Sequence, residues 1–207
     1  MRRRSQVPDH YPNFSTLAQD APAGTWRVVH RDVPRSDVLI VAPHGGGIEP
    51  GTSELATMIA AEEYNLYCFE GLRQFDNRDL HVTSHRFDDP RALSLAARSA
   101  IVVGIHGCKG ANAIFVGGRD TMLAANLSEA LLAAGFPACS KGHCFPAVHP
   151  ENICNRGYRG AGAQLELTVE FRSAVWRASI SQVVRQAIAR QQQELTAVGE
   201  YSPNAEY

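Results

Sequence analysis

The sequence lacks long apolar runs and an excess of charge of either sign. No segment approaches the roughly eighteen apolar residues that a membrane-spanning helix needs. The start, MRRRSQVPDHYPNF, has no apolar stretch of the kind that follows the basic residues of a signal peptide. With a formal net charge of -1, the chain also has no broad basic surface for nucleic acid. We therefore expect a cytoplasmic protein that binds neither membranes nor nucleic acid.

Paired cysteine motifs are absent as well. The five cysteines are an odd number and none forms C-x-x-C, so neither a disulfide framework nor a common redox motif is indicated. We expect reduced, structural thiols. A redox or structural zinc centre at Cys139, His143 and Cys144 is the lesser alternative, because this spacing matches no common ligand pattern.

Length and composition indicate one globular domain. The chain has 207 residues, of which 44% are apolar and 20% are charged, close to the values of average globular proteins. It contains no internal repeat, low-complexity segment or linker. We expect residues 1–207 to form a single domain and a monomer, with loosely held termini at 1–24 and about 201–207.

Apolar runs alternate with helical patterns along the chain, which is typical of an α/β fold. The runs expected to be strands are 25–30, 38–43, 66–71, 80–84, 100–107, 113–118 and 163–171. The segments expected to be helices are 52–64, 90–100, 119–136 and 173–200. Several strand runs are continuously apolar, so we predict a central, mixed and mostly parallel sheet with helices on both faces. In such sheets, ligand sites lie at the carboxyl ends of the strands.

Two of these strand ends carry histidines. His44 follows the run 38–43 and begins the stretch HGGGIE, whose glycines let the backbone turn so that Glu49 points back at the same volume. His106 lies at the end of the run 100–107. Two histidines and one carboxylate leave the fourth position of a zinc ion open to water, as in catalytic zinc sites. We therefore predict a catalytic metal site at His44, Glu49 and His106.

Hydrolysis at such a site also needs a general base that is not bound to the metal. The run 163–171 offers Glu166 and Glu170, on the same side of an expected strand. Glu166 is flanked by Leu165 and Leu167, where partial desolvation raises the pKa of a carboxyl toward neutrality. We predict Glu166 as the base and take Glu170 as the lesser alternative.

The motifs HGGGIEPGTSELA, LHVTSHRFDDP, GIHGCKG and GAQLEL occur in this order over about residues 38–170. Together they resemble the poly-γ-glutamate hydrolase family of phages and bacilli, whose fold is similar to that of the zinc carboxypeptidases. The resemblance implies an open-sided mixed sheet, one zinc ion per chain, and cleavage of γ-glutamyl amide bonds by a zinc-activated water. It assigns the zinc to His44, Glu49 and His106 and the base to Glu166. If the chain is a phage enzyme, it is released on lysis.

The resemblance does not extend to the carboxypeptidases' substrate pockets. Those enzymes space their first histidine and glutamate more closely and have longer chains. An anionic polymer needs cationic or hydrogen-bonding groups near the metal. Most candidates lie in or near the loop-rich segment 136–163, where Asn152 and Asn155 are suited to polarise a carbonyl or hold an oxyanion. The candidate substrate contacts are Lys109, Arg119, Asn152, Asn155, Arg156 and Arg159.

Two alternatives for the function stay open. One is a zinc-dependent deacylase or amidase with another N-acyl or cell-wall peptide substrate. The other is a non-catalytic module that binds an acidic peptide. A nucleophilic Cys108 is a lesser reading, because no nearby base is free of the predicted metal.

Further histidines lie outside the predicted metal site. His81 and His85 stand in LHVTSHRFDD, where Asp88 or Asp89 could complete a second metal site. We favour a structural or substrate-contact role, because His81 falls on an expected strand and the acidic pair precedes Pro90 as a helix cap. His143 and His149, in the loop-rich segment 136–163, are expected to be exposed loop residues.

Overall fold

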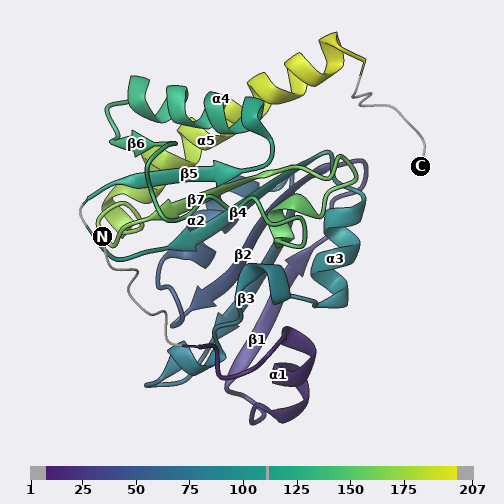
Figure 1. Cartoon of the computed structure of the whole chain (residues 1–207), viewed down its shortest axis with the longest axis vertical. Coiled ribbons are helices and arrows are strands. Elements are labelled where there is room, and N and C mark those ends of the chain that lie inside the picture. Colours follow the sequence, from purple (N-terminus) through teal and green to yellow (C-terminus); the bar gives the residue numbers. More distant parts are fainter. Residues whose placement is uncertain (1–7, 111, 200–207) are drawn as a thin grey trace.

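The computed structural model describes residues 8–110 and 112–199, which form a seven-stranded sheet with helices packed on it (Figure 1). The strands are β1 (Trp26–Arg31), β2 (Val38–Gly46), β3 (Asn65–Gly71), β4 (Ile101–Gly107), β5 (Ile114–Gly118), β6 (Ala138–Cys139) and β7 (Ala163–Leu167). The α-helices are α1 (Phe14–Asp20), α2 (Thr52–Ala60), α3 (Pro90–Ala97), α4 (Thr121–Ala133) and α5 (Ala174–Ala197). Three 3-10 turns are η1 (Asn77–Leu80), η2 (Ser84–Arg86) and η3 (Ile153–Asn155).

The sheet is mixed, as the sequence predicted. Its strand order is β1-β3-β2-β4-β7-β5-β6. The central strands β3, β2, β4 and β7 are parallel neighbours. The antiparallel pairs are β1 with β3 and β5 with β7, and the short β6 pairs in parallel with β5. The carboxyl ends of β2, β4 and β7 therefore meet at one edge of the sheet, where a ligand site is expected.

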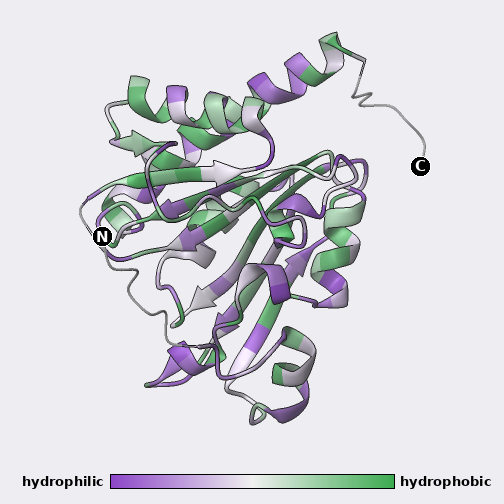
Figure 2. Ribbon diagram, viewed as in Figure 1, coloured by the Kyte–Doolittle hydropathy of each residue, from purple (hydrophilic) through white to green (hydrophobic). Residues whose placement is uncertain are grey.

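Helices cover both faces of this sheet. On one face, α2, α4 and α5 pack in a buried cluster with strand residues such as Ile40, Val103 and Leu165. On the other face, α1 and α3 pack against residues such as Leu39 and Val102. The strands are accordingly apolar on both sides, and Figure 2 shows hydrophobic colour along them. This arrangement explains why the sequence runs are continuous rather than alternating.

Two of the strands expected from the sequence differ in the structure: one is absent and one is shorter. The run 80–84 is not a strand, because η1 ends at Leu80, η2 begins at Ser84 and His81 lies between them. Its alternation arises because Leu80 and Val82 are both buried in the cluster with α1 and α3, a pattern that an irregular segment can share with a strand. Strand β7 ends at Leu167, so Glu170 lies in the following turn rather than on the same strand as Glu166.

The segment after residue 7 is packed, although we expected residues 1–24 to be loosely held. Helix α1 buries Phe14 and Leu17, and the Asn13 side chain accepts a hydrogen bond from its first turn. Ser15 donates two hydrogen bonds to Asp88. The expectation was wrong here because a helix of seven residues is too short to show a clear apolar period. The expected C-terminal loose segment, 201–207, lies outside the described residues.

The helix cap expected before Pro90 is present, and a second aspartate caps another helix. Asp89 accepts a hydrogen bond from the Arg91 amide and precedes Pro90 at the start of α3. Asp120 caps α4 in the same way. Within the described ranges, no helix combines the length and apolarity needed to cross a bilayer.

Candidate metal centre and active site

A tight turn after β2 brings Glu49 back beside His44. The Glu49 amide donates to the His44 carbonyl at 2.9 Å, which closes the turn over the three glycines. Gly46 has a φ of 58°, and a Cβ at this position would lie 2.5 Å from the Gly71 carbonyl oxygen. Only glycine fits both the conformation and the space. The glycines thus allow the end of β2 and the turn before α2 to present two side chains to one point.

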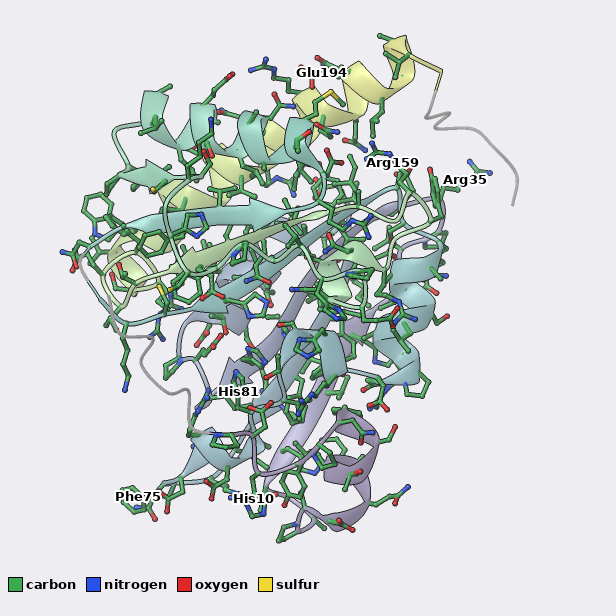
Figure 3. All side chains as sticks on the ribbon, in the orientation of Figure 1. His10, Arg35, Phe75, His81, Arg159 and Glu194 are labelled. Atoms are coloured by element: carbon green, nitrogen blue, oxygen red, sulfur yellow. The ribbon has the colours of Figure 1, made fainter. Side chains whose placement is uncertain are left out.

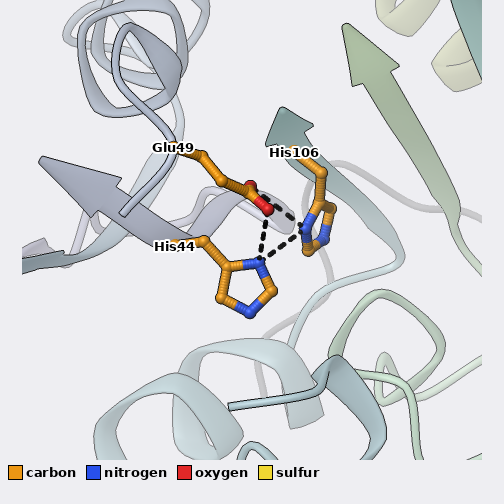
Figure 4. Close-up of side chains that lie close together, drawn as sticks. All are labelled: His44, Glu49 and His106. Atoms are coloured by element: carbon orange, nitrogen blue, oxygen red, sulfur yellow. Dashed lines mark hydrogen bonds and ion pairs between the residues drawn. The ribbon is translucent and has the colours of Figure 1, made fainter. Parts of the chain in front are cut away.

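His44, Glu49 and His106 lie together at the carboxyl edge of the sheet (Figure 4). The Nδ1 atom of His44 lies 3.3 Å from Glu49 Oε1 and 3.1 Å from His106 Nδ1. His106 Nδ1 is 3.8 Å from Glu49 Oε2, which accepts a hydrogen bond of 2.8 Å from the Gly107 amide. One ligand atom from each residue lies within 4.8 Å of the others. The three residues predicted as metal ligands are therefore close enough to share one ion.

The hydrogen bonds around the two histidines orient them as metal ligands. His44 Nε2 lies 2.7 Å from the Val82 carbonyl oxygen, to which it must donate, so in the neutral ring that binds a metal Nδ1 carries the lone pair. That lone pair faces a second imidazole nitrogen and a carboxylate. A metal cation can be shared by such a set of electron donors. A metal-bound histidine commonly donates its other ring N–H to a backbone carbonyl, which fixes its tautomer. The donor set fits a metal ion.

Burial and mutual charge act on the protonation of these groups. Burial lowers the pKa of His106 to about 3, and the neighbouring His44 adds to this, so His106 is held in the neutral form that binds metals. Burial alone would raise the pKa of Glu49, but His44, His106 and the Gly107 amide outweigh it and lower this pKa to about 2. For His44, burial acts to lower the pKa and the Glu49 charge raises it above its ordinary value.

His81 packs against His44 and is itself held by Asp9. The His81 ring stacks on His44 with 4.0 Å between ring centroids, and Figure 3 labels its position. His81 Nδ1 lies 2.6 Å from Asp9 Oδ1, while Asp9 Oδ2 accepts hydrogen bonds from the amide and hydroxyl of Thr83. Asp9 could not be predicted from the sequence, because nothing in the local pattern links residue 9 to a loop more than 70 residues away.

Glu166 lies on the strand next to His106. The two residues are direct partners in the parallel pairing of β4 and β7, so their side chains share one face of the sheet. Glu166 is 8% exposed, and Gln164 Nε2 donates a hydrogen bond of 2.8 Å to its Oε1. Burial raises the pKa of Glu166 well above its ordinary value, the Glu49 charge raises it further, and Gln164 and Arg172 oppose the rise. These surroundings suit a general base working near neutral pH.

Arg172 is a second residue near the site that the sequence did not point to. Its Nη1 donates to the Pro50 carbonyl at 2.5 Å, and its guanidinium packs against Gly107, where a Cβ would lie 2.9 Å from Nε. Its charge acts to lower the pKa of both Glu166 and Cys108. Arg172 thus supplies positive charge beside the candidate site from the turn that follows β7.

The candidate substrate contacts comprise two asparagines and four cations. Both asparagines form hydrogen bonds within the protein. Asn155 is buried and donates to the carbonyls of Ala147 and His149, while its Oδ1 accepts from the amides of Arg119 and Gly162. These bonds hold the long loop 136–163 in place. Asn152 is also buried and lies next to Gln164, to which its Nδ2 donates at 3.1 Å.

The cations are more dispersed. Arg159 forms an ion pair of 2.6 Å with Asp120 at the start of α4, and Figure 3 shows it well apart from His81. Arg156 pairs with Glu151 on the surface of the loop. Lys109 is exposed just beyond β4. Roles in substrate binding stay predictions for these side chains and for Arg119.

The alternatives for a second metal site and a reactive cysteine find no support in the geometry. Asp89 binds Tyr67 and Arg91, and the His85 ring lies beside the His149 ring. Among residues 8–110 and 112–199, only the group at His44 combines three side chains placed to share a metal. All five cysteines are free, and burial raises the pKa of Cys108 to about 12, which keeps this thiol protonated.

Comparisons with known proteins place these features in context. The sequence profile of the family described as poly-gamma-glutamate hydrolase matches residues 11–198. The UPF0714 protein YndL of Bacillus subtilis (strain 168) is 40% identical over 171 residues, covering 81% of this chain and 67% of YndL. The zinc-free structure YNDL-apo gives a TM-score of 0.82 at 34% identity, covering 89% of this chain and 99% of that one. A bacteriophage poly-gamma-glutamate hydrolase gives 0.86 at 28% identity, covering 90% and 100%.

A more distant likeness concerns the fold alone. A metallo-carboxypeptidase from Pseudomonas aeruginosa gives a TM-score of 0.52 at 15% identity, covering 82% of this chain and 61% of that one. The carboxypeptidase-like fold predicted from the sequence is thereby confirmed.

Proposed function

Because this chain belongs to the poly-gamma-glutamate hydrolase family, we propose that it hydrolyses γ-glutamyl amide bonds with one zinc ion per chain. Family membership makes it a hydrolase, and the three clustered ligand-type side chains indicate dependence on a metal. Zinc is the metal that suits two imidazoles, one carboxylate and an open position. The existence of a relative described as zinc-free agrees with this choice.

The observation that carries the proposal is the position of Glu166. It lies directly beside His106 across two parallel strands, it is buried, and it is not part of the His44 cluster. His44, Glu49 and His106 would hold the zinc, which when bound supplies a Lewis acid that polarises the amide carbonyl and acidifies water.

Glu166 has two roles in this proposal. Its carboxylate accepts a proton from the attacking water, and the protonated Glu166 then donates that proton to the departing amine. Burial supports the second step, because a carboxyl with a raised pKa keeps the proton until the amine departs. The substrate we propose is poly-γ-glutamate, an anionic polymer named in the description of the family.

Replacement of two glutamates tests the assignment. We expect Glu166→Gln to keep its zinc and to lose about a thousandfold in kcat, since a general base contributes on the order of 10²–10⁴. Glu170→Gln is the matched control, because Glu170 lies in the turn after β7 and accepts a hydrogen bond from Trp176 that an amide oxygen can also accept. The measurement is the chain length of poly-γ-glutamate over time, together with zinc content.

The outcomes separate the proposals. If Glu166→Gln shortened the polymer at the wild-type rate, Glu166 would have no place in the mechanism. If the zinc-loaded wild type left poly-γ-glutamate intact but cleaved another N-acyl or peptide amide, the substrate class would be wrong while the catalytic site stood.

A further inference from the structure

A chain of buried amides leads from the long loop to Glu166. Asn152 accepts a hydrogen bond from the Cys154 amide through Oδ1 at 3.1 Å. Asn152 Nδ2 donates to Gln164 Oε1 at 3.1 Å, and Gln164 Nε2 donates to Glu166 Oε1 at 2.8 Å. All three side chains are at least nine-tenths buried. None of them is exposed enough for water to replace a lost partner at low cost.

The direction of each bond in this chain is set by the previous one. The Cys154 backbone N–H can only donate, so it fixes Asn152 Oδ1 as the acceptor and turns the Asn152 NH₂ toward Gln164. Gln164 must then present its oxygen to Asn152 and its NH₂ to Glu166. The opposite orientation of Gln164 would bring two NH₂ groups together at one end and two oxygens together at the other.

The sheet leaves room for this contact. Gln164 is paired with glycine on both neighbouring strands, Gly104 of β4 and Gly117 of β5. The turn η3, which begins after Asn152, packs over this gap, and a Cβ on Gly104 would lie 3.5 Å from Cys154 Cβ. The long loop therefore reaches the sheet beside the candidate base.

We propose that Asn152 and Gln164 are positioning residues that hold Glu166 Oε1 as a hydrogen-bond acceptor and leave Oε2 as the atom that takes and returns the catalytic proton. This inference rests on the proposed function of Glu166. The proton moves from the attacking water to Oε2 and from Oε2 to the amine nitrogen, so Glu166 returns to its starting state. Asn152, one of the residues considered for an oxyanion contact, has both ends of its amide engaged in this chain.

Two substitutions of Asn152 separate positioning from mere support of the loop. Asn152→Asp keeps the shape and the bond from Cys154, but its carboxylate cannot donate, so Gln164 must turn its NH₂ toward residue 152 and its oxygen toward Glu166. Asn152→Ala removes the acceptor of the Cys154 amide and the donor to Gln164, but leaves Gln164 free to donate to Glu166. We expect Asn152→Asp to lower kcat about a hundredfold with KM unchanged, and Asn152→Ala, which leaves Gln164 unheld but able to donate, to lower kcat by less, about three- to tenfold. A supporting role alone predicts the reverse order.

A double-mutant cycle excludes a direct effect of the new charge. Gln164→Met removes the donor, and we expect about a tenfold loss in kcat. Adding Asn152→Asp to Gln164→Met should then cause no further loss, because the reversed glutamine is gone. If the two losses multiply, the carboxylate introduced at position 152 acts on Glu166 through its own charge and the proposal is wrong. Zinc content and circular dichroism show whether each variant is folded and loaded.

The side-chain NH₂ signals in NMR spectra of the zinc-loaded protein give a reading that needs no substrate. The Gln164 signal, identified by its loss in Gln164→Met, is expected to shift in Glu166→Gln and in Asn152→Asp and to stay near its wild-type position in Asn152→Ala. An unchanged Gln164 signal in Glu166→Gln would overturn the proposal. If the wild type fails to cleave any γ-glutamyl substrate, the proposed function fails and these signals still decide the positioning chain.

Discussion

At the scale of single residues, Glu166 shows how a catalytic group opposes stability. A carboxyl buried to this degree prefers its proton, while its proposed role needs the ionised form. The neighbours that favour ionisation, Gln164 and Arg172, offset the effect of burial only in part. The folded protein therefore bears a cost at neutral pH that the unfolded chain does not.

This cost predicts the stability of Glu166→Gln. The folded-state pKa of Glu166 lies above its ordinary value of 4.5. Between the two values the folded protein keeps a proton that the unfolded chain releases, so wild-type stability falls as the pH rises through that window. We expect zinc-free Glu166→Gln to be more stable than wild type at pH 7, by about 1.4 kcal/mol for each pH unit by which folding raises the pKa of Glu166. Urea unfolding at pH 7 and below pH 4.5 measures the difference, which should vanish at the lower pH.

Gly107 supports the site through its lack of a side chain. A Cβ there would lie 2.9 Å from Arg172 Nε and 3.0 Å from Glu49 Cβ. We expect Gly107→Ala to displace Glu49 or its hydrogen bond from the Gly107 amide and to weaken zinc binding by about tenfold or more. Competition with a chromophoric chelator gives the Kd. The neighbouring Cys108→Ala serves as the control, and equal zinc affinity in the two variants would refute this account of Gly107.

Some residues of the site could be predicted from the sequence and others could not. His44, His106 and Glu166 could be predicted to lie together because each sits at or near the end of an apolar strand run. Asp9 and Gln164 could not. Asp9 reaches His81 only through tertiary packing, and Gln164 is a neutral amide whose partners are set by a loop folded over the sheet.

At the scale of elements, the start of α4 ties the last helix to the loop 136–163. Asp120 Oδ1 accepts from the Leu123 amide, and its Oδ2 accepts from Arg159 of the loop and Gln191 of α5. Asp120 is 4% exposed. One carboxylate thus joins two helices and the segment that carries Asn152.

Removal of this carboxylate should destabilise the protein as a whole. We expect Asp120→Ala to lower the free energy of unfolding by about 3 kcal/mol, because it takes away a helix cap and leaves buried partners unpaired. Glu129→Ala, on the same helix, removes an exposed ion pair with Arg190 and should cost less than about 1 kcal/mol. Chemical denaturation of both variants makes the comparison, and similar losses would contradict the role given to Asp120.

Predictability differed among the elements for physical reasons. The central strands and the helices α4 and α5 could be predicted because their apolar pattern persists over many residues, and α3 because Pro90 and the acidic pair before it mark its start. Helix α1 was too short for this, and β6 has only two residues. The run 80–84 misled because its alternating residues pack against helices without pairing as a strand.

At the scale of the whole molecule, the candidate site unites four distant parts of the chain. The turn after β2, the end of β4, the strand β7 and the turn η3 meet at one edge of the sheet. The segment at Asp9 and the loop at His81 support the same point from one side. The order of the strands places β4 between β2 and β7, and this topology brings His106 between His44 and Glu166.

The most direct test of the zinc-dependent mechanism is a titration of the zinc-free protein with zinc, with the chain length of poly-γ-glutamate as the readout. We predict that cleavage rises in proportion to added zinc and stops rising at one zinc ion per chain, while His106→Ala stays inactive over the same range because one of three ligands is missing. Full cleavage by the zinc-free protein, or equal recovery in His106→Ala, would contradict it.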